Sequence, residues 1–594
     1  MKKQILIITT ILFVALCLAG AVSAESGDDN LETFSSDASG IIEPEIDEEQ
    51  VGDVTISGQI LKCSDNKPFS GATVTVSNNK ETLASTITEE NGQYQLDFQK
   101  TNTNFIVTAT APGHNPEHQE IKLEDGKNTY TANFQLGMDN VYVATTGNDT
   151  TGDGTQGKPY RTIGKGTIEV NTGGTVHVAA GTYNEVLTIM GKNLNLIGNN
   201  RSNTIIDAAG LNSCVITITS ATVTISNFTI QNGNNSFTST GTDVELSGGG
   251  IYIGSSGKLT INNCTIQNNN INVTSTEADA VAYGAGIYNA GTLTINNSTI
   301  QNNTNTATGA TAAAIGGGIY NKGTLTITGS TIQNNTNKAN VAVGSTLGGG
   351  IYNKGKLTIN NSTIQNNIND AIGVFIAALG GGIYNCGAST IKNSSILKNT
   401  NKVTALGPNP IAHGGGIYFE SGSLTANYNR IVGNSLNTLL VDFGTVDVRY
   451  NWWGSNNPNF KSLIIGTTNY KPWLTYNADL VMQSVTAPTT ARRGRKIRVR
   501  NQVRNGGNIS TGKGFYVAFY LRSTKSSRKY YLGRRWVGNL GVGKSSLRTN
   551  YFRIPKKIKR GRYYILAVAD YTKRISETKR TNNIKYTTRR IRIT

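Results

Sequence analysis

The chain of 594 residues is poor in the side chains that most enzymes use for catalysis. It has four histidines and five cysteines, against 67 glycines. Between Ile251 and Asn434 the acidic residues are Glu277, Asp279, Asp370 and Glu420. Polysaccharide hydrolases need carboxylates close to one glycosidic bond, and calcium sites need several oxygen ligands together. The central part of the chain is therefore predicted to lack a catalytic centre.

Metal, cofactor and disulfide sites are also poorly supported by the sequence. His114 and His118 are four residues apart, but Pro116 between them argues against a helix that would align them on a zinc ion. Without Cys17, which lies in the N-terminal apolar run, four cysteines remain, far apart and without a CxxC pair: Cys63, Cys214, Cys264 and Cys386. We expect no metal, no cofactor and no disulfide framework.

Long hydrophobic runs are absent except at the N-terminus. There Lys2 and Lys3 precede an apolar stretch that ends in Val22-Ser23-Ala24 and is followed by Glu25. Basic residues, an apolar run and small residues at its end are typical of a secretory signal peptide. We predict a signal peptide over residues 1–24, cleaved between Ala24 and Glu25, and a mature protein without a membrane span; an uncleaved anchor is the alternative. The predicted location is extracellular, at the cell surface or cell wall.

Acidic and basic residues are separated along the chain, whose net charge is +18. Residues 25–53 contain 11 acids and no lysine or arginine, which predicts a flexible acidic leader over 25–52. Asp479 to Thr594 holds 30 lysines and arginines against three acids. We find no recognition helix or RNA-binding signature there, so we expect no nucleic-acid partner. An anionic wall polymer or an acidic surface glycan is the expected partner; a face that only aids solubility is the alternative.

A repeated phrase fills the middle of the chain. Residues 316–335 read GGGIYNKGTLTITGSTIQNN, and residues 348–367 read GGGIYNKGKLTINNSTIQNN. The isoleucine of each such phrase stands at 251, 287, 319, 351, 383 and 417, and a repeat near 32 residues made of short alternating segments predicts a β-solenoid. Leu325, Ile327 and Ile332 should point inward, with the threonines between them outward.

Asparagine and glycine should form the corners of these coils, because both tolerate left-handed backbone angles. Like side chains at stacked corners can then hydrogen-bond from coil to coil; the paired corner asparagines are 268–269, 302–303, 334–335 and 366–367. Segments between the repeated phrases, such as TNTATGATAAAI, are predicted to be loops on one side of the stack. Trp452 and Trp453 are expected to cover the last apolar layer.

A tyrosine follows each of these isoleucines and should point outward in a vertical column. Aromatic faces suit sugar rings, so the column is the candidate glycan-binding site; the alternative is that the rings only support one another. The column consists of Tyr252, Tyr288, Tyr320, Tyr352, Tyr384 and Tyr418.

Three stretches resemble known families. GATVTV, NGQYQL and FIVTATAPGH, within residues 53–137, resemble the carboxypeptidase regulatory-like domain. VYVATTGNDTTGDG and the repeats after it, over 141–475, resemble secreted right-handed parallel β-helix proteins of the pectate-lyase-like group. DLV, VRNGG and FYVAFYL, within 479–594, resemble the CARDB domain, an immunoglobulin-like module of bacterial and archaeal surface proteins. In this order the modules resemble adhesin-like surface proteins of bacteria and methanogenic archaea.

The expected fold class is all-β, with a right-handed parallel β-helix solenoid flanked by two small β-sandwich domains. The resemblance implies a non-enzymatic, adhesin-like surface protein that contacts carbohydrate, wall polysaccharide or other cells. Two alternatives stay open. A secreted polysaccharide lyase or hydrolase would depend on Asp149 and Asp153 in GNDTTGDG, where a turn competes with a calcium site. A purely structural envelope protein would need no ligand.

Overall fold

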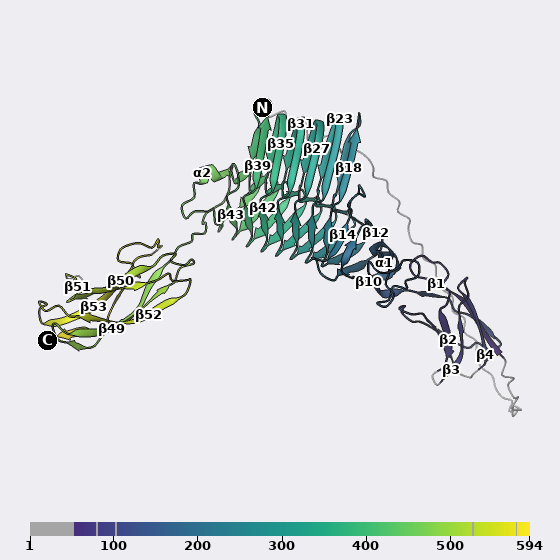
Figure 1. The fold of residues 1–594 in the computed structure, drawn as a ribbon, viewed down its shortest axis with the longest axis horizontal. Helices are drawn as coiled ribbons and strands as arrows, with labels where there is room; N and C mark the ends of the chain where they lie inside the picture. Colours follow the sequence, from purple (N-terminus) through teal and green to yellow (C-terminus); the bar gives the residue numbers. More distant parts are fainter. Residues whose placement is uncertain (1–52, 79–80, 101–103, 526–527, 578) are drawn as a thin grey trace, which may run out of the picture. The chain divides into compact units, whose positions relative to one another are not determined.

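The computed structural model describes residues 53–78, 81–100, 104–525, 528–577 and 579–594. The predicted signal peptide, its cleavage site at Ala24 and Glu25, and the acidic leader over 25–52 lie outside the described residues. The regular secondary structure of the described chain is almost entirely β-strand, with two short helices, α1 (Ile163–Glu169) and α2 (Phe460–Leu463) (Figure 1). In the described part of the chain, no helix is long and apolar enough to cross a membrane. The all-β prediction is confirmed.

The first module is a β-sandwich. One sheet has the order β4-β1-β7 with β8 beside β1, and the other has the order β3-β2-β5-β6. Alternate residues such as Val74, Val76, Phe105 and Val107 are fully buried between the sheets, as the period of two in the sequence predicts. The strands are β1 (Asp53–Lys62), β2 (Thr73–Ser77), β3 (Thr82–Ile87), β4 (Gln93–Gln99), β5 (Phe105–Thr110), β6 (Glu117–Ile121), β7 (Thr129–Thr131) and β8 (Phe134–Leu136).

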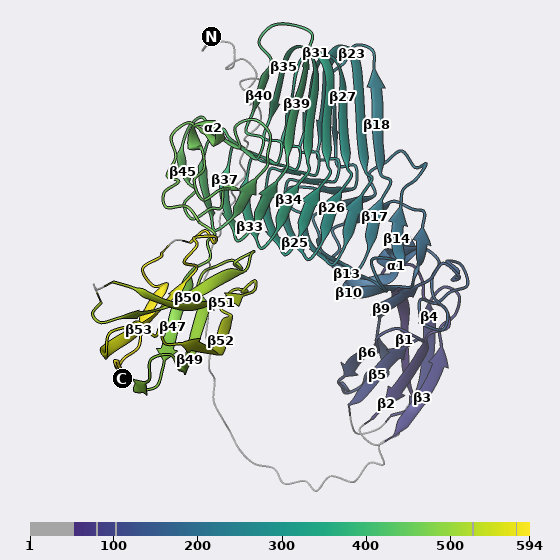
Figure 2. The ribbon, with the colours of Figure 1, turned by 60° about the vertical axis from the view of Figure 1, so that its left-hand side comes forward.

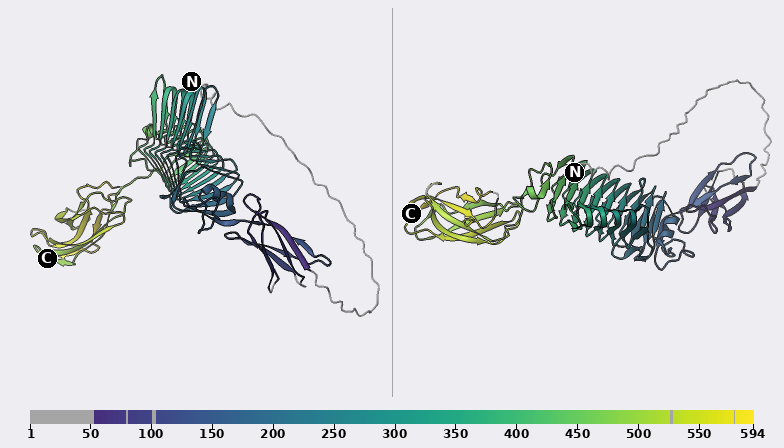
Figure 3. Two further views of the ribbon diagram at one scale, coloured as in Figure 1. Left: turned by 45° about the vertical axis from the view of Figure 1, so that its right-hand side comes forward. Right: turned by 90° about the horizontal axis from the view of Figure 1, so that it is seen from above.

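The second module is a parallel β-solenoid of about nine turns. A representative coil contains β28 (Ile319–Asn321), β29 (Thr324–Thr328), β30 (Thr331–Gln333) and β31 (Thr336–Leu347). Each strand pairs in parallel with its counterpart one repeat away; Leu325, for example, is opposite Leu293 and Leu357. Three sheets enclose the core, and they run from β9 (Met138–Val143) to β45 (Thr445–Asp447), from β11 (Gly181–Tyr183) to β43 (Arg430–Val432), and from β12 (Leu187–Met190) to β46 (Ile464–Ile465) (Figure 3).

The interior and the corners follow the sequence pattern. Leu325, Ile327 and Ile332 are fully buried, whereas Thr326 between the first two is partly exposed. Asn334 has φ 55°, and the same left-handed conformation occurs at Asn268, Asn302 and Asn366. The glycine triplets have a separate cause: a Cβ added at Gly318 would lie 2.6 Å from the Gly350 carbonyl oxygen on the next coil. The stacked backbones leave no room for a side chain there.

Buried asparagines form ladders through the solenoid. The Nδ2 of Asn303 donates to the Oδ1 of Asn335 at 2.9 Å, and Asn335 donates in the same way to Asn367 at 3.0 Å. A second ladder joins Asn289, Asn321, Asn353 and Asn385, each pair at 2.7 Å. These bonds satisfy amides that would otherwise be unpaired in the core, because every coil offers the same acceptor at the same height.

The segments predicted as loops are instead strands, which corrects that expectation. They form an eight-stranded sheet, which we call the fin, and Figure 2 shows it projecting from one side of the solenoid. Asn305 donates from Nδ2 to the carbonyl of Ile315, ten residues later on the same strand, so each long strand doubles back on itself. The fin strands are β18 (Asn234–Ser239), β19 (Val244–Ser247), β23 (Asn270–Tyr283), β27 (Thr304–Ile315), β31, β35 (Ile368–Leu379), β39 (Thr400–Ala405) and β40 (Ile411–His413).

The fin has a small core of its own. Ala307 on an outgoing half and Ala314 on a returning half are both buried, together with Ala339, Val341 and Ile376 from other coils. A third ladder, Asn305 to Asn337 to Asn369 to Asn401, runs through its base at 3.0–3.1 Å. In-register pairing between the fin strands satisfies their backbone N–H and C=O groups, so the fin needs few large apolar side chains. Alanine and threonine therefore suffice, and they gave too weak an alternation to indicate strands.

Aromatic residues close the end of the solenoid. Trp453 is buried in the core, and Phe460, Tyr470 and Trp473 pack against it. Trp452 instead contacts the ring of Tyr476. Of the two tryptophans expected to cover the last layer, Trp453 is thus in the core, while later aromatic residues add to the cover.

The third module is another β-sandwich, with one sheet of order β47-β49-β52 and one of order β48-β55-β53-β50-β51, where β54 pairs with β53. Its core includes Val499, Phe515, Val517, Phe519 and Ile565, all fully buried. The strands are β47 (Leu480–Thr486), β48 (Thr490–Ala491), β49 (Lys496–Asn505), β50 (Phe515–Arg522), β51 (Tyr530–Val537), β52 (Ser545–Arg553), β53 (Gly561–Ala569), β54 (Ile584–Tyr586) and β55 (Ile591–Ile593).

Candidate functional site

The six predicted tyrosines do form one column. They are the central residues of β20 (Ile251–Ile253), β24 (Ile287–Asn289), β28, β32 (Ile351–Asn353), β36 (Ile383–Asn385) and β41 (Ile417–Phe419). Neighbouring ring centroids are 5.0–5.1 Å apart, with interplanar angles of 2–16°. The strand spacing near 4.8 Å imposes this stacking once the same residue occupies the same position in every coil.

The column is more buried than an outward direction would suggest. Tyr320 and Tyr384 are 8% and 6% exposed, and the other four rings are partly buried. Tyr283, at the base of fin strand β23, makes an edge contact with Tyr320 at 4.9 Å between ring centroids. The residues in register with Tyr283 on the next fin strands are Ile315, Leu347 and Leu379. The tyrosines thus lie where the fin leaves the solenoid.

Stacking restricts what the column can bind. Each internal ring has a tyrosine ring on both faces, so the aromatic faces that a sugar would contact are occupied along the column. What stays accessible along the column is ring edge, and the two end rings have Thr217 and Leu440 in register beyond them. Carbohydrate binding by Tyr252, Tyr288, Tyr320, Tyr352, Tyr384 and Tyr418 stays a prediction, and the geometry limits it to edge contacts.

The burial of these rings predicts an alkaline transition. Burial raises the pKa of Tyr320, Tyr352 and Tyr384 far above the ordinary value near 10, and neighbouring tyrosines raise the pKa of Tyr320 further. The unfolded chain would lose these protons near pH 10 while the folded chain keeps them. The free energy of unfolding should therefore be unaffected below about pH 9 and should fall as the pH rises above about 10.

An alkaline titration that records tyrosinate absorbance together with far-ultraviolet circular dichroism tests this prediction. Some of the 25 tyrosines should resist ionisation until the β-sheet signal is lost, and should then ionise together. Smooth ionisation of all tyrosines near pH 10 with the sheet signal intact would contradict it.

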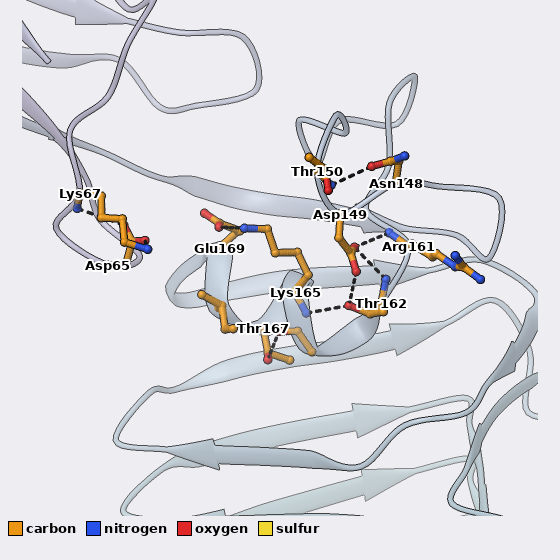
Figure 4. A network of polar contacts seen from close by, with 12 residues as sticks. Asp65, Lys67, Asn148, Asp149, Thr150, Arg161, Thr162, Lys165, Thr167 and Glu169 are labelled. Carbon is orange, nitrogen blue, oxygen red and sulfur yellow. Dashed lines mark hydrogen bonds and ion pairs between the residues drawn. The ribbon is translucent and has the colours of Figure 1, made fainter. Parts of the chain in front are cut away.

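The acids that were the best candidates for calcium are engaged in a turn. Asp149 accepts hydrogen bonds from the backbone N–H groups of Arg161 at 2.7 Å and Thr162 at 3.1 Å, and from the Thr162 hydroxyl at 2.8 Å (Figure 4). Asp153 accepts from the N–H and the hydroxyl of Thr155. Of the two interpretations left open for this loop, these contacts favour the turn.

Other acids of the solenoid have local partners as well. Glu185 accepts from the N–H groups of Ile163 and Gly164, both at 2.8 Å, and so caps α1. Asp370 pairs with Lys402 on the next coil at 3.1 Å. Glu277 and Asp279 lie at the bend of fin strand β23. Within the described ranges, no group of three or more histidine, cysteine, aspartate or glutamate side chains is placed to hold a metal ion.

The three acids of the basic third module all have partners within the module. Asp570 accepts from the N–H groups of Arg574 and Ile575, both at 2.9 Å, and Arg580 lies 3.4 Å from both Asp570 and Glu577. Glu577 also accepts from the N–H of Leu480, and Asp479 accepts from Asn582. The side chains of Asp570 and Glu577 are fully buried. The acids therefore organise one edge of the module and leave the outer faces of its sheets to cations.

Comparison with known families supports the resemblances seen in the sequences of the first and third modules. Residues 477–587 match the CARDB family. This chain carries a CARDB domain. Residues 55–137 match the carboxypeptidase regulatory-like domain. Together with the parallel β-solenoid between them, these matches confirm the predicted domain architecture. The two domains and the solenoid fit a surface protein.

Solved structures similar to this chain include the CARDB domain of a Pyrococcus furiosus protein, solved in complex with di-metal ions. It is 20% identical, the match covers 20% of this chain and 93% of that chain, and the TM-score is 0.16. A β-glucosidase from Listeria innocua is 12% identical over 20% of this chain and 16% of its own, with a TM-score of 0.15. No curated protein shows significant similarity to the chain.

Two features of the surface were not anticipated. The fin was missed because its sequence alternates between small residues. The other is the pairing of cations with aromatic rings on the CARDB domain, for example Arg534 over Tyr516. The frequency of tyrosine and arginine in FYVAFYL and LGRRWVG is a signal that could have indicated it, but which rings meet which cations depends on strand register.

Proposed function

We propose that this protein is a non-enzymatic, adhesin-like surface protein whose solenoid displays the fin and whose CARDB domain contacts extracellular polymer. The observation that carries the proposal is that the acids of the solenoid already have partners within the fold. Asp149, Asp153, Glu185 and Asp370 each have backbone, hydroxyl or lysine partners, so they are used for folding. Asp149 and Glu185 lie close together, but both are held by successive backbone N–H groups at the start of α1. Polysaccharide hydrolysis and elimination both need groups free to exchange protons near one bond.

The domain content supports the same proposal. Long arrays of identical coils are effective at presenting a surface, because each coil adds area without a new fold. The fin adds to that surface, and it exposes Val343 at 40% and Phe375 at 60% of their area, side by side in register. We propose that the fin, more than the stacked tyrosines, contacts other cells or wall polysaccharide.

The test uses the mature protein, residues 25–594, incubated with a panel of plant, wall and host polysaccharides with and without calcium. No release of reducing or unsaturated ends above a heat-denatured control is expected, while retention on at least one insoluble polysaccharide is expected. Metal-dependent turnover would overturn the proposal in favour of a secreted lyase or hydrolase. If the protein shows no turnover and is not retained on polysaccharide or on cells, the result would favour a purely structural envelope protein.

A further inference from the structure

The outer face of the second CARDB sheet carries an ordered set of aromatic rings. On β50, Phe515, Val517, Phe519 and Leu521 are fully buried in the core, so the alternate residues Tyr516 and Tyr520 turn outward. Trp536 on β51 is directly opposite Tyr516, and their ring centroids are 4.8 Å apart. Tyr564 on β53 and Tyr586 on β54 extend the set, with ring centroids 6.0 Å apart.

Each of these rings has a cation above it. The guanidinium carbon of Arg534 is 4.3 Å from the ring centroid of Tyr516, that of Arg574 is 5.6 Å from Trp536, and that of Arg590 is 5.0 Å from Tyr564. The ammonium groups of Lys529 and Lys525 lie 5.6 and 5.9 Å from Tyr520 and Tyr586. Half of the ten cation–ring contacts among the described residues are on this one face. We call these five cations with their rings the braced face.

Bracing prepares these side chains to bind anions. A guanidinium that lies over a ring has already lost part of its rotamer freedom. Arg534 is held further by a hydrogen bond from a terminal nitrogen to the Tyr571 hydroxyl at 2.8 Å, and Arg534, Arg574 and Arg590 are all exposed. The conformational cost of ordering the side chain is then met in folding and not in binding. The acids of the domain do not neutralise this face, because Asp570 and Glu577 are buried with Arg580 and Asp479 is bonded to Asn582.

The layout fits an extended ligand with repeated charges. Tyr516 and Tyr520 are four residues apart on one strand, so their cations recur at about 13 Å along it, with others on neighbouring strands. A shallow depression of about 340 Å³ on the same sheet is lined by Lys525, Tyr564, Lys585 and Tyr586, and is large enough for a sugar residue. Planar carboxylates match the two-pronged donor edge of arginine. CARDB domains are surface modules, which favours a glycan over a nucleic acid.

We propose that the braced face of the CARDB domain binds a linear polysaccharide that carries carboxylate groups. The inference extends the proposed function by naming the partner class and the residues, and it rests on the surface location proposed there. It is independent of whether the chain has catalytic activity, because it concerns retention and not turnover.

The experiment compares two variants of the mature protein that lose the same charge. The braced variant carries Arg534→Ala, Arg574→Ala and Arg590→Ala. The matched control carries Arg498→Ala, Arg500→Ala and Arg553→Ala on the opposite sheet, where β49 and β52 expose their arginines. Binding to polygalacturonate is measured at fixed ionic strength by calorimetry. We expect the braced variant to bind at least 20-fold more weakly and the control less than threefold more weakly.

Conservative replacements separate bracing from charge and from folding. Arg534→Lys, Arg574→Lys and Arg590→Lys together keep the net charge but lose the planar donor edge, and they should weaken binding about fivefold with an unchanged thermal transition. The same three replacements at 498, 500 and 553 should have no effect.

Neutral galactan, a sulfated glycan and single-stranded DNA serve as comparison ligands. Tighter binding to polygalacturonate than to all three supports the proposal. Equal losses in the two alanine variants, or equal or tighter binding to DNA or the sulfated glycan, would overturn it. No binding to polygalacturonate by the unmodified protein would also overturn it, while leaving the absence of turnover as a separate result.

Discussion

Asn335→Leu is expected to lower the free energy of unfolding of the solenoid by about 3–5 kcal/mol. Asn335 is fully buried, and its Nδ2 donates to the Oδ1 of Asn367 and to the carbonyl of Ile300, both at 3.0 Å. Its Oδ1 accepts from the N–H and the Nδ2 of Asn303. Leucine has a similar volume but no polar atoms, so it would leave the buried N–H of Asn303 without its acceptor and would remove one of the two donors to the Oδ1 of Asn367.

Urea denaturation followed by circular dichroism measures this effect. Asn334→Gly is the matched control, because Asn334 is exposed and has φ 55°, a conformation that glycine adopts freely. Its free energy of unfolding should change by no more than about 0.5 kcal/mol. Similar effects of the two substitutions would show that the ladder contributes little beyond the corner itself.

Arg535→Ala is expected to destabilise the CARDB domain by about 3 kcal/mol. Arg535 is 6% exposed and lies between the two sheets. Its Nε donates to the Oδ1 of Asn501 at 2.6 Å, and its terminal nitrogens donate to the hydroxyl and the carbonyl oxygen of Ser546 at 3.0 and 2.9 Å. Burial lowers the pKa of Arg535 to about 10, and the charge of Arg548 lowers it further.

Arg535→Met separates the loss of packing from the loss of the hydrogen bonds. Methionine and alanine both remove the buried cation and its hydrogen bonds, but methionine fills more of the space, so the loss of stability should be about half that of alanine. The thermal transition of the CARDB domain in differential scanning calorimetry is the measurement. If methionine were as destabilising as alanine, the hydrogen bonds would account for the effect; if alanine caused no loss, the buried arginine would have no net structural role.

Prediction from sequence succeeded where one residue type has one physical role. Leu325, Ile327 and Ile332 had to point inward because alternation in a strand leaves no other choice, and the corner asparagines had to adopt left-handed angles. The column that begins with buried Cys264 holds Ser298, Ser330, Ser362 and Ser394 in later coils, and each of these serines accepts a hydrogen bond from a backbone N–H of the preceding coil.

Prediction failed where the outcome depends on what lies beside a residue in space. Ala312 and Ala314 gave no hydrophobic signal, yet the other half of the same strand buries them. Tyr320 was correctly expected to point away from the coil interior, but its burial depends on two neighbouring rings and on Tyr283. Arg534 and Tyr516 are 18 residues apart, and only strand register brings one over the other.

The identity of the repeats means that the solenoid can change length in whole units. Removing residues 316–347 would join Ile315 directly to Gly348, and the new junction would read GGGIYNKG as before. Asn303 would then face Asn367, Tyr288 would stack on Tyr352, and each ladder would lose one rung without a mismatch. Gain or loss of whole repeats would thus lengthen or shorten the solenoid in steps of about 4.8 Å per coil.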